Sequence, residues 1–454
     1  MLFGKGKVSG LTLIAFFVFM FALANLAEAQ TVQFTTLTNF NSANGSQPLS
    51  GGLTLGNDGF FYGTTTSGGT NNDGTVFKVT TNGVLTSLVS FNITNGQGPL
   101  RKLILGNDGC FYGTTQLGGT NISFSYGTIF KMTTNGVLTQ LFSFHGTDGQ
   151  YPNELTLASD GNFYGTARGG GSGGYGTGFK ITTNGALTTL TNFDSARQKP
   201  NGLTLLNDGN FYGTSYGVFG SIYGTFFKMA TNGALTTLAS FNSFNGAQPD
   251  SPLVLGLDGN LYGTTMFGGN NNLTALSGTT FKVTTNGTIT TLVFFNITNG
   301  YNPGGLIIGN DGNTGNNDST NAGTLYKLTA SGTFTTLYSF GLAAANHSGI
   351  YTNSLGACPS RLAQGSDGSF YGTTYGGNTN GLGIVFKLTI IPPPPIPLKI
   401  QPLTGKVVLN WTNPVFNLQS APEVTGTFTN IPNATSPYTN LTSGNRNFFR
   451  LIAN

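Results

Sequence analysis

The sequence from Leu53 to Asn92, LTLGNDGFFYGTTTSGGTNNDGTVFKVTTNGVLTSLVSFN, decides the fold. It returns from Leu103 to Phe144 as LILGNDGCFYGTTQLGGTNISFSYGTIFKMTTNGVLTQLFSF. The same order of residues begins again at Leu155, Leu203, Leu253 and Leu362. It is also present, more weakly, from Leu306. Asp-Gly pairs mark the copies at intervals of 48 to 56 residues: Asp58, Asp108, Asp160, Asp208, Asp258, Asp311 and Asp367. A period near 50 residues predicts propeller blades or solenoid coils.

Each copy contains four short strand-like runs, which in the first copy are residues 53–56, 60–65, 75–80 and 84–91. Threonine, valine, phenylalanine and tyrosine are frequent in these runs and favour strands. Asn57-Asp58-Gly59 and Asn82-Gly83 join neighbouring runs, and Asn-Gly favours a tight hairpin because both turn positions need positive φ. Four antiparallel strands linked by tight turns predict a propeller blade.

The two ends of the repeat region complement each other. Residues 32–41 match the fourth strand of a copy, as in residues 235–242, but no first three strands precede them. The copy that starts at Leu362 has three strands and stops at Thr389, before a run of prolines. We therefore expect an all-β, seven-bladed β-propeller closed by the N-terminal strand, which removes two exposed sheet edges. The alternative, a β-solenoid, predicts capped ends instead of complementary ones.

The sixth copy departs from the pattern. Residues 313–321 stand where the other copies have Phe-Tyr-Gly-Thr-Thr or a close variant of it. Asparagine and glycine are depleted in strands, so we expect only three good strands in the sixth blade.

The motif GTVFKVTTNGVLTSLVSF, preceded by DGFFYGTT, resembles the bacterial tandem GloVer repeat over about residues 31–390. This resemblance implies an exported, propeller-like protein of no established activity, and it supplies no catalytic residues. The phrase PNGLTLLNDGNFYGT at residues 200–214 also resembles NHL-type propeller repeats. That resemblance implies that the first strand of each blade lies at the central channel and the fourth at the rim.

The N-terminal segment has the features of a secretory signal peptide. Lys5 and Lys7 precede an apolar run at residues 11–24, and Ala27-Glu28-Ala29 provides small residues for cleavage. The apolar run is shorter than the roughly 20 residues that a membrane-spanning helix needs, although an uncleaved anchor is the alternative. We expect residues 1–29 to be removed, no membrane span in the mature chain, and a secreted or cell-envelope location.

The remaining layout has three parts. Residues 30–391 are the expected propeller, residues 392–397 a proline-rich linker, and residues 398–454 a small β-sandwich-like module. Expected strands in the module are residues 407–411, 415–419, 427–431 and 448–451. Its Trp411, the one tryptophan of the chain, is expected in its core. The segments VVLNW, FNLQSA and NFFRL resemble a small β module found at the C-terminus of exported bacterial repeat proteins.

Composition excludes some partners. Charged residues make up 7% of the chain and form no basic cluster, so nucleic-acid binding is not expected.

Cys110 and Cys358 fall in blades two and seven, which are not neighbours, and we predict two free thiols. We expect no cofactor and no metal, because the Asp-Gly turns lack a calcium-loop pattern and two histidines are too few for zinc. A monomer is expected.

Long, variable loops lie on the propeller face opposite the tight turns, and binding residues concentrate on such loops. Aromatic faces with neighbouring amides and hydroxyls suit sugars, although aromatic residues can equally pack between loops. The candidate ligand-binding residues on this face are Tyr151, Arg168, Tyr216, Phe267, Tyr301 and Tyr375, with Phe219 and Tyr351 as further aromatic candidates.

Catalytic patterns are scarce. His145 and His347 fall in separate inter-blade loops, and no G-x-S-x-G motif is present. We expect a non-catalytic binding or scaffold protein that recognises a glycan or an envelope protein through its loop face. One alternative is a carbohydrate-active hydrolase or lyase that uses loop carboxylates, and another is a structural or adhesive surface protein. The loop acids are Asp148, Glu154, Asp194 and Asp250.

Overall fold

The structure is a computed structural model. It describes residues 31–453 apart from residues 50, 121–124, 218–222, 270–277, 297–302, 309–313, 319–322, 341–343, 346–350, 379, 392–397, 404–405, 413–415, 424, 426 and 442–447. The predicted signal peptide and linker therefore lie outside the described residues. The chain divides into two compact units, of which one is Val32–Thr389 and the other contains Ile390–Asn454. The described residues form strands and no helix, and so they contain no helix that is long and apolar enough to cross a membrane.

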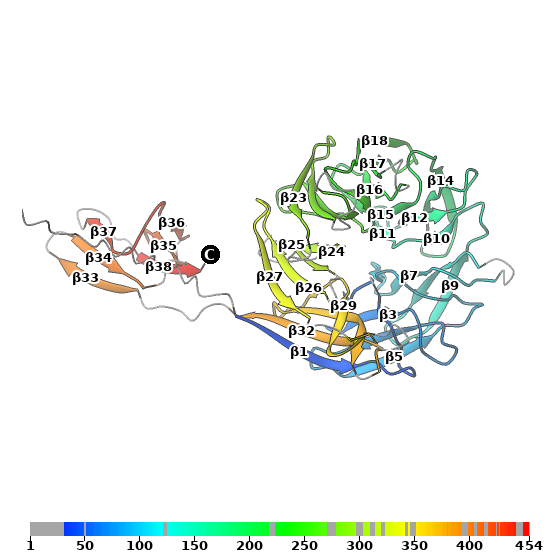
Figure 1. Cartoon of the computed structure of the whole chain (residues 1–454), viewed down its shortest axis with the longest axis horizontal. Helices are drawn as coiled ribbons and strands as arrows, with labels where there is room; N and C mark the ends of the chain where they lie inside the picture. The colour runs from blue at the N-terminus through cyan, green and yellow to red at the C-terminus, as the bar shows by residue number, and fades with distance from the viewer. Residues whose placement is uncertain are drawn as a thin grey trace, which may run out of the picture. The chain divides into compact units, whose positions relative to one another are not determined.

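The larger unit is built from successive antiparallel sheets with blade-like strand order (Figure 1). Along the chain, the sheets after the N-terminal strand β1 (Thr31–Asn39) contain β2 (Thr54–Leu55), β3 (Phe61–Thr65), β4 (Thr75–Val79) and β5 (Leu85–Ser90); β6 (Ile104–Leu105), β7 (Phe111–Thr115), β8 (Thr128–Met132) and β9 (Leu138–Ser143); β10 (Gln150–Pro152), β11 (Thr156–Leu157), β12 (Phe163–Gly169), β13 (Thr177–Ile181) and β14 (Leu187–Asn192); β15 (Pro200–Leu205), β16 (Phe211–Ser215), β17 (Thr225–Met229) and β18 (Leu235–Ser240); β19 (Ala247–Pro249), β20 (Val254–Leu255), β21 (Leu261–Phe267), β22 (Thr279–Val283) and β23 (Ile289–Phe294); β24 (Pro303–Ile308), β25 (Thr314–Asp318), β26 (Thr324–Leu328) and β27 (Phe334–Ser339); and β28 (Ala344–Ala345), β29 (Tyr351–Pro359), β30 (Ala363–Gln364), β31 (Phe370–Asn378) and β32 (Ile384–Ile391).

The tight turns form as the sequence predicts. Asp58 Oδ1 accepts a hydrogen bond from the Phe60 backbone N–H at 3.3 Å, and Asp108 Oδ1 accepts one from Cys110 at 3.1 Å. Each aspartate therefore caps the backbone two residues further along. The predicted runs of the first copy match β2 to β5 within two residues.

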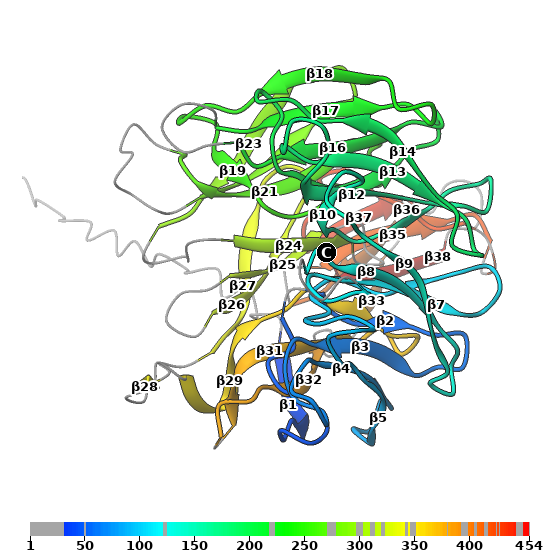
Figure 2. The same ribbon diagram turned by 90° about the vertical axis from the view of Figure 1, so that its right-hand side faces the viewer.

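The N-terminal strand lies in the same sheet as the last strands of the larger unit. The order in that sheet is β1-β32-β31-β29, and β1 runs beside β32 in the view turned by 90° (Figure 2). Backbone hydrogen bonds extend the pairing, from Phe40 N–H to Gly383 O at 3.0 Å and from Gln47 N–H to Leu382 O at 3.0 Å. The first and last parts of the repeat region are thus held together.

The expectation of three good strands in the sixth copy is wrong. Residues Thr314–Asp318 form β25, which pairs along its length with β26 and also with β24. The segment TGNND has weak intrinsic strand preference, but two neighbouring strands offer it a full set of backbone hydrogen-bond partners. Tertiary context of this kind overrides local propensity.

The core lies between neighbouring sheets. Tyrosines of second strands pack on aromatic rings of the next sheet, as Tyr62 does on Phe111 with ring centroids 4.0 Å apart and Tyr112 on Phe163 at 4.1 Å. Tyr62 and Tyr112 are completely buried. The repeated tyrosine therefore packs between neighbouring sheets.

The described residues of the smaller unit form two three-stranded sheets. One has β33 (Lys399–Leu403), β34 (Lys406–Asn410) and β37 (Tyr438–Leu441), and the other has β36 (Thr429–Asn430), β35 (Phe416–Ala421) and β38 (Phe448–Ala453). Sequence reasoning missed β33 and β37. Trp411 is 6% exposed and packs with Leu409 and Leu418, so its predicted place in the core is confirmed.

Candidate functional site

The short first strands of the sheets in the larger unit line one cavity of about 570 Å³, which we call the channel cavity. Its wall is mostly aliphatic and includes Leu55, Leu105, Leu157, Leu205 and Val254. Threonine hydroxyls connect neighbouring sheets here, because those of Thr54, Thr156 and Thr204 each donate to the carbonyl of the first leucine of the next copy at 2.6 Å. The first strands therefore face a common cavity.

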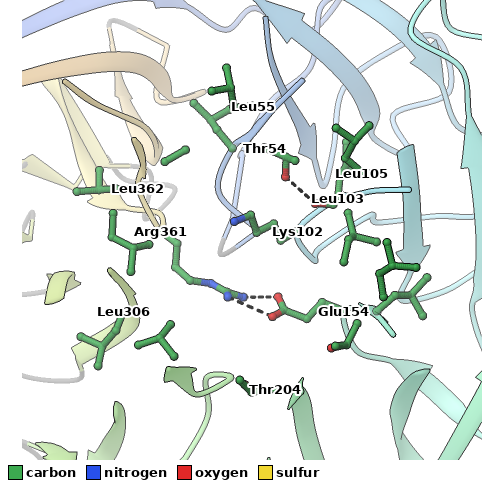
Figure 3. Close-up of a pocket in the computed structure, with 18 of the residues that line it drawn as sticks. Thr54, Leu55, Lys102, Leu103, Leu105, Glu154, Thr204, Leu306, Arg361 and Leu362 are labelled. Atoms are coloured by element: carbon green, nitrogen blue, oxygen red, sulfur yellow. Dashed lines mark hydrogen bonds and ion pairs between the residues drawn. The ribbon is translucent and has the colours of Figure 1, made fainter. Parts of the chain in front are cut away.

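An ion pair crosses this cavity. Arg361 Nη2 lies 2.6 Å from Glu154 Oε2, and Arg361 Nη1 donates to Glu154 Oε1 at 3.3 Å (Figure 3). The two side chains are 10% and 14% exposed. Burial alone would raise the pKa of Glu154, but the charge and hydrogen bonds of Arg361 and the charges of Lys102 and Arg101 lower it. Glu154 is therefore ionised and balances one positive charge.

Two further cations lie close to this pair. Lys102 lines the channel cavity, and Arg101 precedes it in the chain. Neither side chain forms a hydrogen bond or ion pair within the part of the chain that the structure describes, and both are partly buried. Burial and the charge of Arg361 lower the pKa of Lys102, while burial and the charge of Arg168 lower that of Arg101. The surroundings thus disfavour both charges.

Glycines of neighbouring sheets make room for the ion pair. A methyl group added at Gly305 would lie 2.2 Å from Arg361 Cδ, and one added at Gly202 would lie 3.1 Å from Glu154 Cγ. Sequence reasoning named Glu154 only as a loop acid, and it missed Lys102 and Arg361. The signal was available in the residue before the first leucine of each copy: Gly52, Lys102, Glu154, Gly202, Pro252, Gly305 and Arg361.

A second pocket, of about 400 Å³, is lined by residues in or next to the second, third and fourth sheets, and we call it the tyrosine pocket. It contains two of the predicted ligand-binding residues, Tyr151 and Arg168. Sequence reasoning missed the remaining lining side chains. The tyrosine pocket is lined by Gln116, Gln150, Tyr151, Arg168, Gly169, Gly174, Tyr175, Gln198 and Lys199.

Arg168 links the tyrosine pocket to Tyr216, a third predicted residue. The guanidinium carbon of Arg168 lies 5.3 Å from the centre of the Tyr216 ring, and Lys199 Nζ lies 5.8 Å from it. Arg168 Nη2 also forms an ion pair with Asp250 Oδ1 at 2.9 Å. Burial, and then the charge of Asp250, raise the pKa of Tyr216. Tyr216 is therefore a neutral ring that stacks with cations at the edge of the pocket.

The other predicted residues are not brought into this pocket. Phe267 ends β21 and the half-buried Tyr375 lies in β31, and neither lines either cavity described above. Tyr301 and Phe219 lie outside the described residues. Tyr351 begins β29, and its side chain is also outside the description.

The loop acids are each paired with a base. Asp148 pairs with His145 at 3.3 Å and Asp194 with Arg197, while Asp250 and Glu154 pair with arginines as described above. His347 lies outside the described residues. Cys110 and Cys358 are free thiols, as predicted. Among the described residues, no group of three or more His, Cys, Asp or Glu side chains is placed to hold a metal ion.

Comparison with known proteins gives a family match and distant structural relatives. A family model described as the Gloeobacter/Verrucomicrobia repeat matches residues 23–206 and 152–354. No curated protein matches the chain.

Among solved structures, the extracellular domain of a proposed hybrid two component system from B. thetaiotaomicron is 11% identical, with a TM-score of 0.50 over 92% of this chain and 57% of that one. A gluconolactonase from Xanthomonas campestris is 12% identical, with a TM-score of 0.37 over 58% of this chain and 79% of that one. At these identities the first likeness concerns the fold alone.

Proposed function

The chain belongs to the Gloeobacter/Verrucomicrobia repeat family, and we propose that it is an exported, non-catalytic binding protein. Its larger unit is a closed seven-bladed β-propeller whose loop face recognises a glycan. The observation that carries this proposal is the tyrosine pocket, where Tyr151 and Tyr175 lie beside Arg168 and the amides of three glutamines.

One glycine–proline contact supports closure of the ring. A methyl group added at Gly74 would lie 2.7 Å from Cδ of Pro99 in the next sheet. The same contact joins the last sheet to the start of the first repeat, where a methyl group at Gly383 would lie 2.8 Å from Pro48 Cδ. The equivalent pairs between them are Gly127 and Pro152, Gly176 and Pro200, Gly224 and Pro249, and Gly278 and Pro303.

Aromatic packing supports the same conclusion. Tyr371 of the last sheet packs on Phe61 of the first repeat with ring centroids 4.4 Å apart. Tyr164 packs on Phe211 between the third and fourth sheets, also at 4.4 Å. Since one contact joins both successive sheets and the two ends of the repeat region, a closed ring with no free sheet edge accounts for both.

The chemistry of the tyrosine pocket suits a sugar. Tyr151 and Tyr175 are each 37% exposed, so part of each ring is free to stack on the C–H face of a pyranose. Gln116, Gln150 and Gln198 supply both donors and acceptors for sugar hydroxyls. Binding sites commonly combine such apolar surfaces with a few placed polar groups. A catalytic role gains no support, because the four loop acids are each paired with a base.

The test measures binding of the mature chain, residues 30–454, to an array of bacterial and plant polysaccharides. Variants Tyr151→Ala and Tyr175→Ala should weaken binding of a retained glycan at least tenfold, because each removes a stacking surface. The matched control is Phe244→Ala, which removes an aromatic side chain that is 62% exposed and lies outside the pocket.

The outcomes separate the proposals. Retention that falls in both tyrosine variants and persists in the control supports a glycan site in the tyrosine pocket. Retention that is equal in all variants, or no retention on any polysaccharide, overturns it and leaves a structural or adhesive role. Hydrolysis of the retained polysaccharide would show that the protein is a carbohydrate-active enzyme and not a non-catalytic binding protein.

A further inference from the structure

We propose that the channel cavity binds a small amphiphilic carboxylate, whose acid group pairs with Lys102 and whose hydrocarbon body lies against the aliphatic wall. This site is separate from the tyrosine pocket, since the two cavities share no lining residue. The two proposals can therefore be tested independently of each other.

The charges at the cavity do not balance. Arg361 and Glu154 neutralise each other through two hydrogen bonds, which leaves Lys102 and Arg101 without a carboxylate of their own among the described residues. Lys102 points toward the cavity (Figure 3). Buried charges are normally paired, and only 7% of this chain is charged. An unpaired cation at a cavity therefore indicates a site for an anion from outside the chain.

The aliphatic wall defines the rest of the ligand. Leucine, isoleucine and valine side chains from successive first strands surround the volume next to Lys102, among them Leu105, Leu157 and Ile307. A cavity of about 570 Å³ falls within the usual range for small-molecule sites. An inorganic anion would leave this apolar surface uncovered, whereas a carboxylate with a hydrocarbon chain would cover it.

The cost of keeping Lys102 charged supports a ligand role. Its pKa is lowered by burial and by Arg361, against the attraction of Glu154. The folded protein therefore holds this proton less tightly than the unfolded chain, so at neutral pH the charge reduces stability. A charge that lowers the stability of the free protein is typical of binding sites, where function and stability compete.

Octanoate is the probe, measured by isothermal titration calorimetry on the mature chain, with octylammonium as the cation of the same length. We expect octanoate to bind and octylammonium not to bind. Affinity should rise about fourfold per added methylene from butyrate to octanoate, as apolar surface becomes covered.

Lys102→Met is the decisive variant, because methionine is an unbranched side chain only one atom shorter than lysine and carries no charge. We expect at least a tenfold loss of octanoate affinity, with a thermal midpoint at or above that of the original protein. Lys78→Met is the matched control, since the Lys78 ammonium lies 4.8 Å from the Phe60 ring, outside the cavity lining. Octanoate binding that is unchanged in Lys102→Met, equal binding of octylammonium, no dependence on chain length, or a lower midpoint in Lys102→Met would each overturn the proposal.

Discussion

The aspartate of each tight turn does more than close that turn. Asp160 Oδ1 accepts the Asn162 backbone N–H at 3.0 Å, while Oδ2 accepts the Tyr164 hydroxyl at 3.0 Å and Lys180 Nζ at 3.2 Å. The aspartate thus joins the first turn to the second and third strands. The Asp–Tyr bond recurs in other sheets: Asp58 with Tyr62, Asp108 with Tyr112, Asp208 with Tyr212, Asp258 with Tyr262 and Asp367 with Tyr371.

These bonds predict how stability depends on acid. Burial alone would raise the pKa of Asp160, but hydrogen bonds from Asn162, Lys180 and Tyr164 lower it to about 2. Because the unfolded value is near 3.9, the ionised Asp160 stabilises the fold fully above about pH 4, and this contribution is lost as the pH falls toward 2. Asp160→Asn should lower the urea midpoint at pH 7 and flatten its decline between pH 4 and pH 2.

The control for this prediction is Ser159→Ala, a change at an exposed neighbour. It leaves every hydrogen bond of Asp160 in place and should follow the original protein at each pH. If Asp160→Asn shows the same acid-dependent decline as this control, the aspartate does not carry the contribution.

At the scale of the elements, each blade begins with a residue followed by proline, and in the described part of the chain that residue has positive φ. Tyr151 at φ 57° and Lys199 at φ 55° both belong to this set. The others are Gln47, Gly98, Gln248 and Cys358. Since the conformation recurs whatever the side chain, it belongs to the repeat and not to a site. The side chain at this position is free to vary, which is how two of them come to line the tyrosine pocket.

A glycine before the first leucine of a copy is expected to matter where the side chain of another sheet passes over it. In Gly305→Ala the added methyl group would fall 2.2 Å from Arg361 Cδ. The arginine must then leave Glu154, and an unpaired buried carboxylate is costly. We expect the variant to lose about 3 kcal/mol in the free energy of unfolding, measured by urea denaturation at pH 7.

Gly169→Ala is the matched control, because its added methyl group would meet nothing nearer than 3.4 Å. It should change the free energy of unfolding by less than about 1 kcal/mol. A loss in Gly305→Ala no larger than in this control would show that Arg361 rearranges without cost.

At the scale of the whole molecule, the N-terminal strand belongs to one sheet of the larger unit and packs against a second. The Phe34 ring stacks on Tyr338 with centroids 4.2 Å apart and lies 5.1 Å from Phe386 in β32. It also meets the edge of Phe340 at 5.4 Å. Strand β1 therefore packs both on its own sheet and on the preceding one.

Phe34→Ala tests this packing. The loss of a partly buried ring between two sheets should reduce the free energy of unfolding by about 3 kcal/mol, measured by chemical denaturation. Thr35→Ala, at an exposed position of the same strand, should reduce it by less than about 0.5 kcal/mol. Equal effects of the two changes would mean that β1 is not docked, and the closed ring would then be abandoned.

Features that neighbouring residues determine could be predicted from the sequence, whereas features that depend on distant residues could not. The 50-residue period, the strand positions and the Asp-Gly turns follow from local propensity and turn geometry, so reading the sequence found them. The second strand of the sixth sheet was missed because neighbouring strands, and not its own residues, hold it in place. Of the predicted binding residues, Tyr151 and Arg168 line one pocket and Tyr216 lies against Arg168, since all three come from adjacent sheets.

Only the tertiary structure decided which charges meet. Arg361 and Glu154 are 207 residues apart in the chain, and nothing near either of them marks the other as a partner. They meet because equivalent positions of successive sheets converge on one cavity, where the inner strands lie within reach of one another. The same convergence brings Lys102 to the aliphatic wall, and it turns residues scattered along a weakly charged chain into one charged site.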